Sequence, residues 1–175
     1  MAWIFGLSAE CGSDAATAMQ FAQHFEGVTW VLSNSHQCHC RTDIFQDIEE
    51  NWWCRVYPNS ISEVGIDTAE SAYLMTELGI LLYQHLRSAP PFRYALVGVE
   101  VDEFRIYREL LEEPFGLSIP GLVLAVEVGQ ALGVTSIFRS FSTGYVWQPY
   151  EGEVYNPLMA SPDLKNKLNE LLAVS

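Results

Sequence analysis

The alternation of hydrophobic and polar positions predicts a strand, a helix and a second strand within the first part of the chain. Residues 2–8 are a continuous apolar run, which is typical of a buried strand. A helix is expected over 13–25, because its apolar residues recur at the spacing of one helical face: Ala15, Ala18, Met19 and Ala22. Residues 28–33 are rich in Val and Trp and predict the next strand. This order predicts a βαβ unit in which 2–8 and 28–33 pair in parallel.

The longest helix is expected over 68–87, where apolar side chains lie nearly all round: Tyr73, Leu74, Met75, Leu78, Ile80, Leu81 and Leu82. A helix on the surface of a protein shows an apolar stripe of only about 100°. We therefore expect this helix to be buried, either in the core or in a homodimer interface. Residues 94–101 follow as another continuous apolar run and predict a central strand that is buried on both faces.

The rest of the chain predicts shorter elements. These are a polar loop over 34–42, a short acidic helix over 43–51, a strand over 52–57, helices over 102–113 and 124–132, a strand or hairpin over 136–147, and a final helix from 161. No repeat or linker divides the chain. We therefore expect a single domain over 1–175, of the α/β or α+β class, with a mixed sheet of about four to six strands and a long buried central helix.

The composition narrows the class of protein. Apolar residues make up 49% of the chain and charged residues 18%, which excludes an intrinsically disordered protein. The 22 Asp and Glu residues outnumber the 9 Lys and Arg residues, so the net charge is -13. Phosphate backbones and anionic lipids repel so acidic a chain, and we expect it to bind neither nucleic acid nor membranes. A basic protein partner fits this charge. A simpler interpretation is that the charge keeps an apolar protein soluble.

The start of the chain lacks the basic residues and the long apolar run of a secretory signal. The longest apolar stretch, around 78–83, is far shorter than the roughly 20 residues that span a bilayer. We therefore expect a cytoplasmic protein, in which all four cysteines stay reduced: Cys11, Cys38, Cys40 and Cys54.

The densest group of chemically reactive side chains is the run from His36 to Cys40, His-Gln-Cys-His-Cys. Imidazole nitrogen and thiolate sulfur are the usual ligands of zinc. A fully extended segment spaces alternate side chains too widely to place three of them on one ion, so a site would need a tight loop or an outside ligand. Cys11 is the best outside candidate, because the expected parallel strands place it at the same sheet edge. The candidate zinc ligands are Cys11, His36, Cys38, His39 and Cys40. No pair has Cys-x-x-Cys spacing, and buried free cysteines are the simpler interpretation.

A second candidate site is aromatic. Tyr145, Trp147, Tyr150 and Tyr155 lie close together in the sequence with carboxylates between them. Amphipathic rings of this kind suit the recognition of a protein partner or stacking on a sugar. The alternative is that the rings cover the hydrophobic core.

No motif fixes a reaction. The chain contains none of the patterns G-x-G-x-x-G, G-x-x-x-x-G-K-S/T, H-E-x-x-H or G-x-S-x-G. Its small size and acidity resemble those of toxin-neutralising immunity proteins, a likeness of composition and not of motif. We therefore expect a non-enzymatic cytoplasmic protein that acts by binding another protein, as a monomer or a homodimer. The alternative is a small metal-binding or thiol-dependent enzyme or sensor that uses the loop 36–40 with Cys11.

Overall fold

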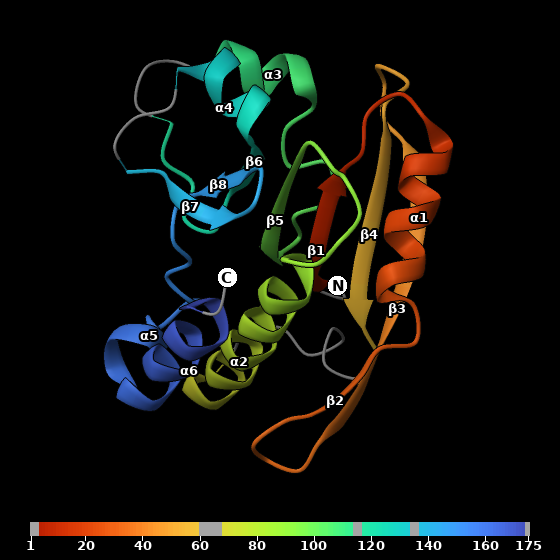
Figure 1. The fold of residues 1–175 in the computed structure, drawn as a ribbon. Helices are drawn as coiled ribbons and strands as arrows, with labels where there is room; N and C mark the ends of the chain where they lie inside the picture. The colour runs from red at the N-terminus through yellow and green to blue at the C-terminus, as the bar shows by residue number, and fades with distance from the viewer. Residues whose placement is uncertain (1–3, 60–67, 114–116, 134–136, 174–175) are drawn as a thin grey trace.

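A computed structural model of the chain describes residues 4–59, 68–113, 117–133 and 137–173. Within these residues, eight strands form one antiparallel sheet, and six helices pack around it (Figure 1). The strands are β1 (Phe5–Glu10), β2 (Thr29–Val31), β3 (Gln37–Gln46), β4 (Trp52–Pro58), β5 (Tyr94–Val99), β6 (Val123–Ala125), β7 (Arg139–Ser142) and β8 (Tyr145–Trp147). The helices are α1 (Ala15–Phe25), α2 (Ala69–Leu86), α3 (Tyr107–Glu112), α4 (Val126–Leu132), α5 (Pro157–Ala160) and α6 (Pro162–Ala173).

Helices cover the two faces of the sheet unequally. The strand order is β2-β3-β4-β1-β5-β6-β8-β7. The larger hydrophobic cluster lies on the face that α1, α2, α5 and α6 cover, which we call the inner face. A smaller cluster on the outer face includes residues of α3 and α4. The protein therefore has a main core and a second, smaller core on opposite sides of one sheet.

The central strand β1 supplies side chains to both cores. Phe5, Leu7 and Ala9 join the larger cluster on the inner face. Ser8 and Glu10 point to the outer face, because side chains alternate along a strand. All six residues of β1 are buried, so Glu10 is a carboxylate in the interior of the protein.

The fold class expected from the sequence is wrong. The sheet has eight antiparallel strands instead of a mixed set of four to six. There is also no βαβ unit, because β4 and β3 lie between β1 and β2. After Gly27, which has a left-handed φ of 77°, the chain continues in the direction of α1 into β2 and then folds back as β3 (Figure 1). The first two residues of the expected strand 2–8 lie outside the described residues.

The segment 37–46 forms β3, where the sequence predicted a loop and an acidic helix. Cys38 and Cys40 are buried and His39 is exposed, which is the alternation of a strand with one buried face. The turn that follows depends on Asp47, whose carboxylate accepts hydrogen bonds from the N–H groups of Glu49 and Asn51 and from the Trp53 indole. The helix prediction failed because this turn, and not a helix, satisfies the polar groups of the acidic segment.

The helix expected over 68–87 is α2, but it is not the central element of a small sheet. It packs on the inner face against β1 and β5 and lies beneath α5 and α6. Thr68 and Ser71 cap its N-terminus with reciprocal hydrogen bonds. Glu77, in the middle of α2, accepts hydrogen bonds from the N–H (3.0 Å) and the hydroxyl (2.7 Å) of Ser33. Glu77 thereby ties the β2–β3 hairpin to the helical layer.

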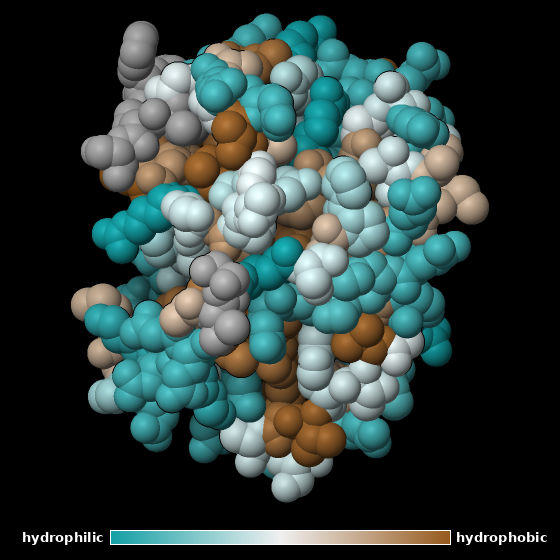
Figure 2. All heavy atoms as spheres, in the orientation of Figure 1, coloured by the Kyte–Doolittle hydropathy of each residue, from teal (hydrophilic) through white to brown (hydrophobic). Residues whose placement is uncertain are grey.

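The surface seen in Figure 2 is mostly hydrophilic, and hydrophobic side chains show in several separate places. None of the described helices is long and apolar enough to cross a membrane.

Candidate functional site

The Cys/His segment is divided between the two faces of β3. Cys38 and Cys40 lie in the inner core, whereas His39 is exposed, with its Nδ1 2.9 Å from the hydroxyl of Thr29. His36 lies in the exposed turn before the strand. Across the residues that the structure describes, no three His, Cys, Asp or Glu side chains are grouped so that they could hold a metal ion.

Cys11 lies at the other end of the sheet. Its N–H donates to the carbonyl of Trp52 in β4, whereas Cys40 is opposite Pro58 at the far end of that strand. These positions differ by six residues along β4 (58 minus 52), which is about 20 Å at the rise of a strand. The structure therefore does not bring the five expected zinc ligands together.

All four cysteines are buried free thiols. Burial raises the pKa of every one of these thiols, and raises it to about 12 for Cys40 and Cys54. The thiolate is the form that attacks electrophiles and binds metals. Thiols held neutral in the core act as small apolar groups, so the geometry offers no reactive cysteine.

The four aromatic residues expected to bind a partner differ in exposure. Trp147 and Tyr150 are buried in the larger core. Tyr145 is half-buried and stacks on Phe92, with 4.4 Å between the ring centroids. Tyr155 is exposed. Three of the four rings therefore cover the core, and one faces solvent.

Tyr155 is one of three exposed apolar residues that lie close together in the sequence, two of them just before α5 and one within it. Val154, Tyr155 and Met159 are 62%, 53% and 86% exposed, and we call these three residues the C-terminal patch. Tyr155 and Asn156 adopt left-handed φ angles of 76° and 48°. This conformation is strained for a tyrosine and costs about 1 kcal/mol or more, so the surrounding contacts must enforce it.

Contacts before and within the patch hold this segment against the body of the protein. The N–H of Glu153 donates to the hydroxyl of Thr76 on α2 at 3.1 Å, and the Tyr150 hydroxyl donates to the Glu153 carboxylate. Leu158, between Tyr155 and Met159, is buried in the larger core. The patch is therefore presented to solvent from a segment that is anchored at Glu153 and at Leu158.

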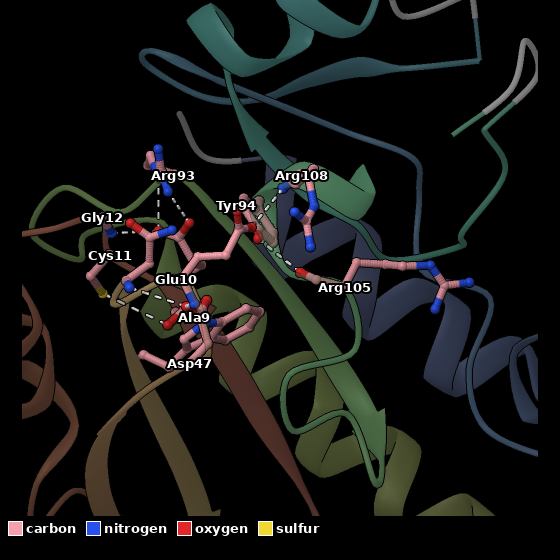
Figure 3. A network of polar contacts seen from close by, with 12 residues as sticks. Ala9, Glu10, Cys11, Gly12, Asp47, Arg93, Tyr94, Arg105 and Arg108 are labelled. Carbon is pink, nitrogen blue, oxygen red and sulfur yellow. Dashed lines mark hydrogen bonds and ion pairs between the residues drawn. The ribbon is translucent and has the colours of Figure 1, made fainter. Parts of the chain in front are cut away.

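A buried ion pair at the end of β1 was not foreseen from the sequence (Figure 3). Glu10 is completely buried, and its carboxylate accepts hydrogen bonds from Arg93 Nε, at 2.9 Å, from Arg93 Nη2 and from the N–H of Gly12. Burial raises the pKa of Glu10, and the charge and hydrogen bonds of Arg93 partly offset that rise. The pair therefore keeps a carboxylate in the outer core.

The guanidinium of Arg93 is held on a third side by an aromatic ring. Its Cζ lies 3.9 Å from the ring centroid of Tyr107, the first residue of α3, in a cation–π contact. The hydrogen bonds of Arg93 to described residues use Nε and Nη2. Among these residues, Nη1 has no hydrogen-bond acceptor. The side chain of Arg93 is 31% exposed, so the guanidinium is fixed in place and still accessible.

A pocket of about 430 Å³ opens beside Arg93. We call it the Arg93 pocket. Its lining also includes Phe92, Tyr107, Glu127 and Tyr145. The Tyr145 hydroxyl accepts a hydrogen bond from the Phe92 N–H (3.1 Å) and donates to the Phe92 carbonyl (3.2 Å). Burial raises the pKa of Tyr145, so its ring stays neutral. Contacts within the protein therefore hold the side chains of Arg93 and Tyr145 in place in the walls of the pocket.

The sequence carried one signal for this pair. Glu10 follows the first apolar run by two residues, and Arg93 immediately precedes the apolar run of β5. Charged residues at the ends of buried strands are natural partners only if the two strands are neighbours, and β1 pairs with β5 so that Glu10 faces Tyr94. The sequence predicted a different partner for β1, and the pair was missed for that reason.

Comparison with protein-family models, with curated proteins and with solved structures found no match to this chain. Function therefore has to be inferred from the residues and their geometry.

Proposed function

We propose that this protein acts in the cytoplasm by binding a basic protein partner, without catalysing a reaction of its own. The observation that carries the proposal is the C-terminal patch of Val154, Tyr155 and Met159. Three exposed apolar side chains from one anchored segment of six residues are unlike the single exposed apolar residues found on any surface.

The anchored segment favours binding. A surface already held in one conformation loses little entropy when a partner covers it, so more of the contact energy appears as affinity. Strain in the backbone of Tyr155 supports the same interpretation, because strained residues that are retained often serve a function. Tyrosine is also among the residues that contribute most to binding at protein interfaces.

Charge supports a basic partner. The net charge of -13 attracts a cationic protein over a distance and speeds the encounter, most strongly at low salt. Glu151, beside the patch, adds an exposed carboxylate to the rim. An apolar patch with an exposed carboxylate close to it in the sequence matches a partner that has an apolar contact beside Lys or Arg.

The cysteines support a reducing compartment, because all four are free thiols. Their burial gives no support to the alternative of a thiol-dependent or metal-binding enzyme or sensor, since that chemistry needs an accessible thiolate.

The test is affinity purification from the native host with three baits. These are the wild-type chain, the double variant Tyr155→Ser/Met159→Ser, and the control variant Ile48→Ser. Ile48 is 87% exposed in the β3–β4 turn, far from α5 (Figure 1). We expect one basic protein to be enriched by the wild type and the control and not by the double variant. Its recovery should fall when salt is raised from about 0.05 M to about 0.3 M, because salt screens the charges.

Two further measurements complete the design. A photo-crosslinking residue in place of Tyr155 should capture the same protein, and one in place of Ile48 should not. Because all the substituted residues are exposed, the baits should unfold at the same temperature. Equal enrichment by all three baits, or none by any, would refute the role of the patch.

A further inference from the structure

The Arg93 pocket has the features of a small-molecule site. Its volume of about 430 Å³ falls within the range of about 300–1,000 Å³ for such sites. Aromatic rings of Phe92, Tyr107 and Tyr145 line it, together with one cationic and one anionic side chain, Arg93 and Glu127. It shares no residue with the C-terminal patch, so a ligand here is a property beyond the proposed protein binding.

Arg93 offers a preset hydrogen-bond donor. Glu10 fixes two of its nitrogens and Tyr107 covers one face of the guanidinium, so the side chain is already ordered. A ligand that accepts a hydrogen bond from Nη1 does not have to restrict a flexible arginine, which makes the contact stronger. A carbonyl oxygen is a suitable acceptor.

The charges around the pocket favour a neutral ligand. The carboxylate of Glu10 balances the charge of Arg93, which leaves the exposed Glu127 and the net charge of -13 to repel an anion. A cationic ligand would lie beside the guanidinium of Arg93. A neutral molecule is repelled neither by the negative charge of the protein nor by the guanidinium of Arg93. It can still donate a hydrogen bond from an N–H to the carboxylate of Glu127.

The aromatic lining favours a planar ligand, because flat rings gain most from contact with other rings. A lactam heterocycle combines these features, because it is flat and neutral and carries a carbonyl for Arg93 and an N–H for Glu127. We propose that the Arg93 pocket binds a neutral oxo-purine or oxo-pyrimidine base or nucleoside without a phosphate group. Stacking of bases on aromatic and arginine planes is a common mode of base recognition.

The test is calorimetric titration of the full chain with inosine, which has both a ring carbonyl and a ring N–H. Inosine 5′-monophosphate tests the repulsion of an anion, and indole tests a flat ring that has no carbonyl. We expect inosine to bind saturably, and the other two probes to bind at least about tenfold more weakly, the factor that about 1.4 kcal/mol gives. Amide NMR signals of Val128 and Gly144, which line the pocket, should shift with inosine.

Variants test the assigned groups. Glu127→Ala removes the acceptor, and Glu112→Ala, also exposed but outside the pocket lining, is its matched control. Replacing Arg93 alone would leave the buried Glu10 carboxylate without its cation, so the donor is tested with the double variant Glu10→Gln/Arg93→Gln. Glu127→Ala and the double variant should each weaken inosine binding about tenfold or more, and the control less than about twofold.

Three outcomes would overturn the proposal. They are an absence of saturation by inosine, tighter binding of the monophosphate than of inosine, and equal inosine affinity in the wild type and the Glu127→Ala variant. None of them bears on the C-terminal patch, so this proposal and the proposed function can fail separately.

Discussion

At the scale of single residues, position decides the state of a carboxyl group in this protein. Most of its 22 acidic side chains can face water, but Glu10 is completely buried and Glu153 is largely enclosed beside Tyr150. Glu10 has a cation to offset the cost of burial, whereas Glu153 has a neutral phenol. The two carboxyls should therefore respond differently to substitution and to pH.

The first prediction concerns the Glu10–Arg93 pair. Arg93→Ala should lower the free energy of unfolding by about 3–5 kcal/mol, because it leaves a buried carboxylate without its cation. Glu10→Gln should cost less, because glutamine leaves no buried charge and its amide oxygen still accepts hydrogen bonds. Urea denaturation of the two variants measures both values. A larger loss for Glu10→Gln than for Arg93→Ala would contradict this interpretation.

The second prediction concerns Glu153, whose pKa burial raises from 4.5 to about 7. Between these two pH values the folded state holds a proton that the unfolded state releases, so the stabilising contribution present at low pH is lost as pH rises. The loss by pH 7 should be on the order of 2–3 kcal/mol. Glu153→Gln should remove this loss in denaturation experiments from pH 4.5 to pH 8. Glu151→Gln is the control, and the same trend in both variants would indicate a general effect of charge instead.

At the scale of elements, two histidines join the ends of two helices. His24 in the last turn of α1 and His85 in the last turn of α2 stack with 4.0 Å between the ring centroids. The Nε2 of each ring lies within 3 Å of the other residue's backbone carbonyl, at 2.9 Å for His24 and 2.7 Å for His85. Each ring therefore donates its Nε2–H to a carbonyl at the end of the other helix, where acceptors are left over.

The third prediction is that acid weakens this contact. Burial lowers the pKa of His85, the hydrogen bond to the His24 carbonyl partly offsets that shift, and the nearby His24 ring adds to it, so the folded state resists protonation. The other groups near these rings are uncharged, namely Phe25, Trp30 and Ser88. They therefore supply no negative charge that would raise the pKa of His85 again. The stability from neutral His85 is present above pH 6.5 and is lost as pH falls below it. His85→Gln should reduce this loss in thermal denaturation from pH 7.5 to pH 5, and the exposed His39→Gln should not.

The fourth prediction concerns the packing of α2. Leu78 is completely buried, whereas its neighbour Leu81 is only partly buried. Leu78→Ala should lower the free energy of unfolding by about 2–5 kcal/mol, because it removes buried contacts and leaves a cavity. Leu81→Ala should cost clearly less. Equal losses in chemical denaturation would mean that the inner core is not centred on the Leu78 side of the helix.

At the scale of the whole molecule, the sheet and the C-terminal helices cover the apolar surface of α2. One side of α2 packs on β1 and β5, and α5 and α6 pack on another. The homodimer interface that the sequence left open for this helix is therefore not needed to bury it.

The fifth prediction follows from this coverage. We expect a monomer in sedimentation experiments at low micromolar concentration. The melting temperature should not change with protein concentration, since a dimer that stabilises the fold would make it rise. A dimer whose melting temperature rises with concentration would show that the chain buries further surface by self-association.

The sequence by itself determined several of the local elements. The helical period predicted a helix over 13–25, which is confirmed by α1, and the apolar run 94–101 predicted the strand that is β5. The expected strand or hairpin at 136–147 is the β7–β8 pair, although residue 136 lies outside the described residues. These predictions succeed because side-chain period and turn chemistry depend only on neighbours in the chain.

Only the tertiary structure decided which strands pair and which side chains meet. Pairing β1 with β4 and β5 brings Glu10 to Arg93 and leaves Cys11 far from Cys40. Burial in the same core makes Trp147 and Tyr150 structural, while Tyr155, in a strained backbone conformation, stays exposed to solvent. Segments far apart in the sequence supply these contacts, and their energies depend on the full set of neighbours. The local pattern therefore could not specify the candidate sites.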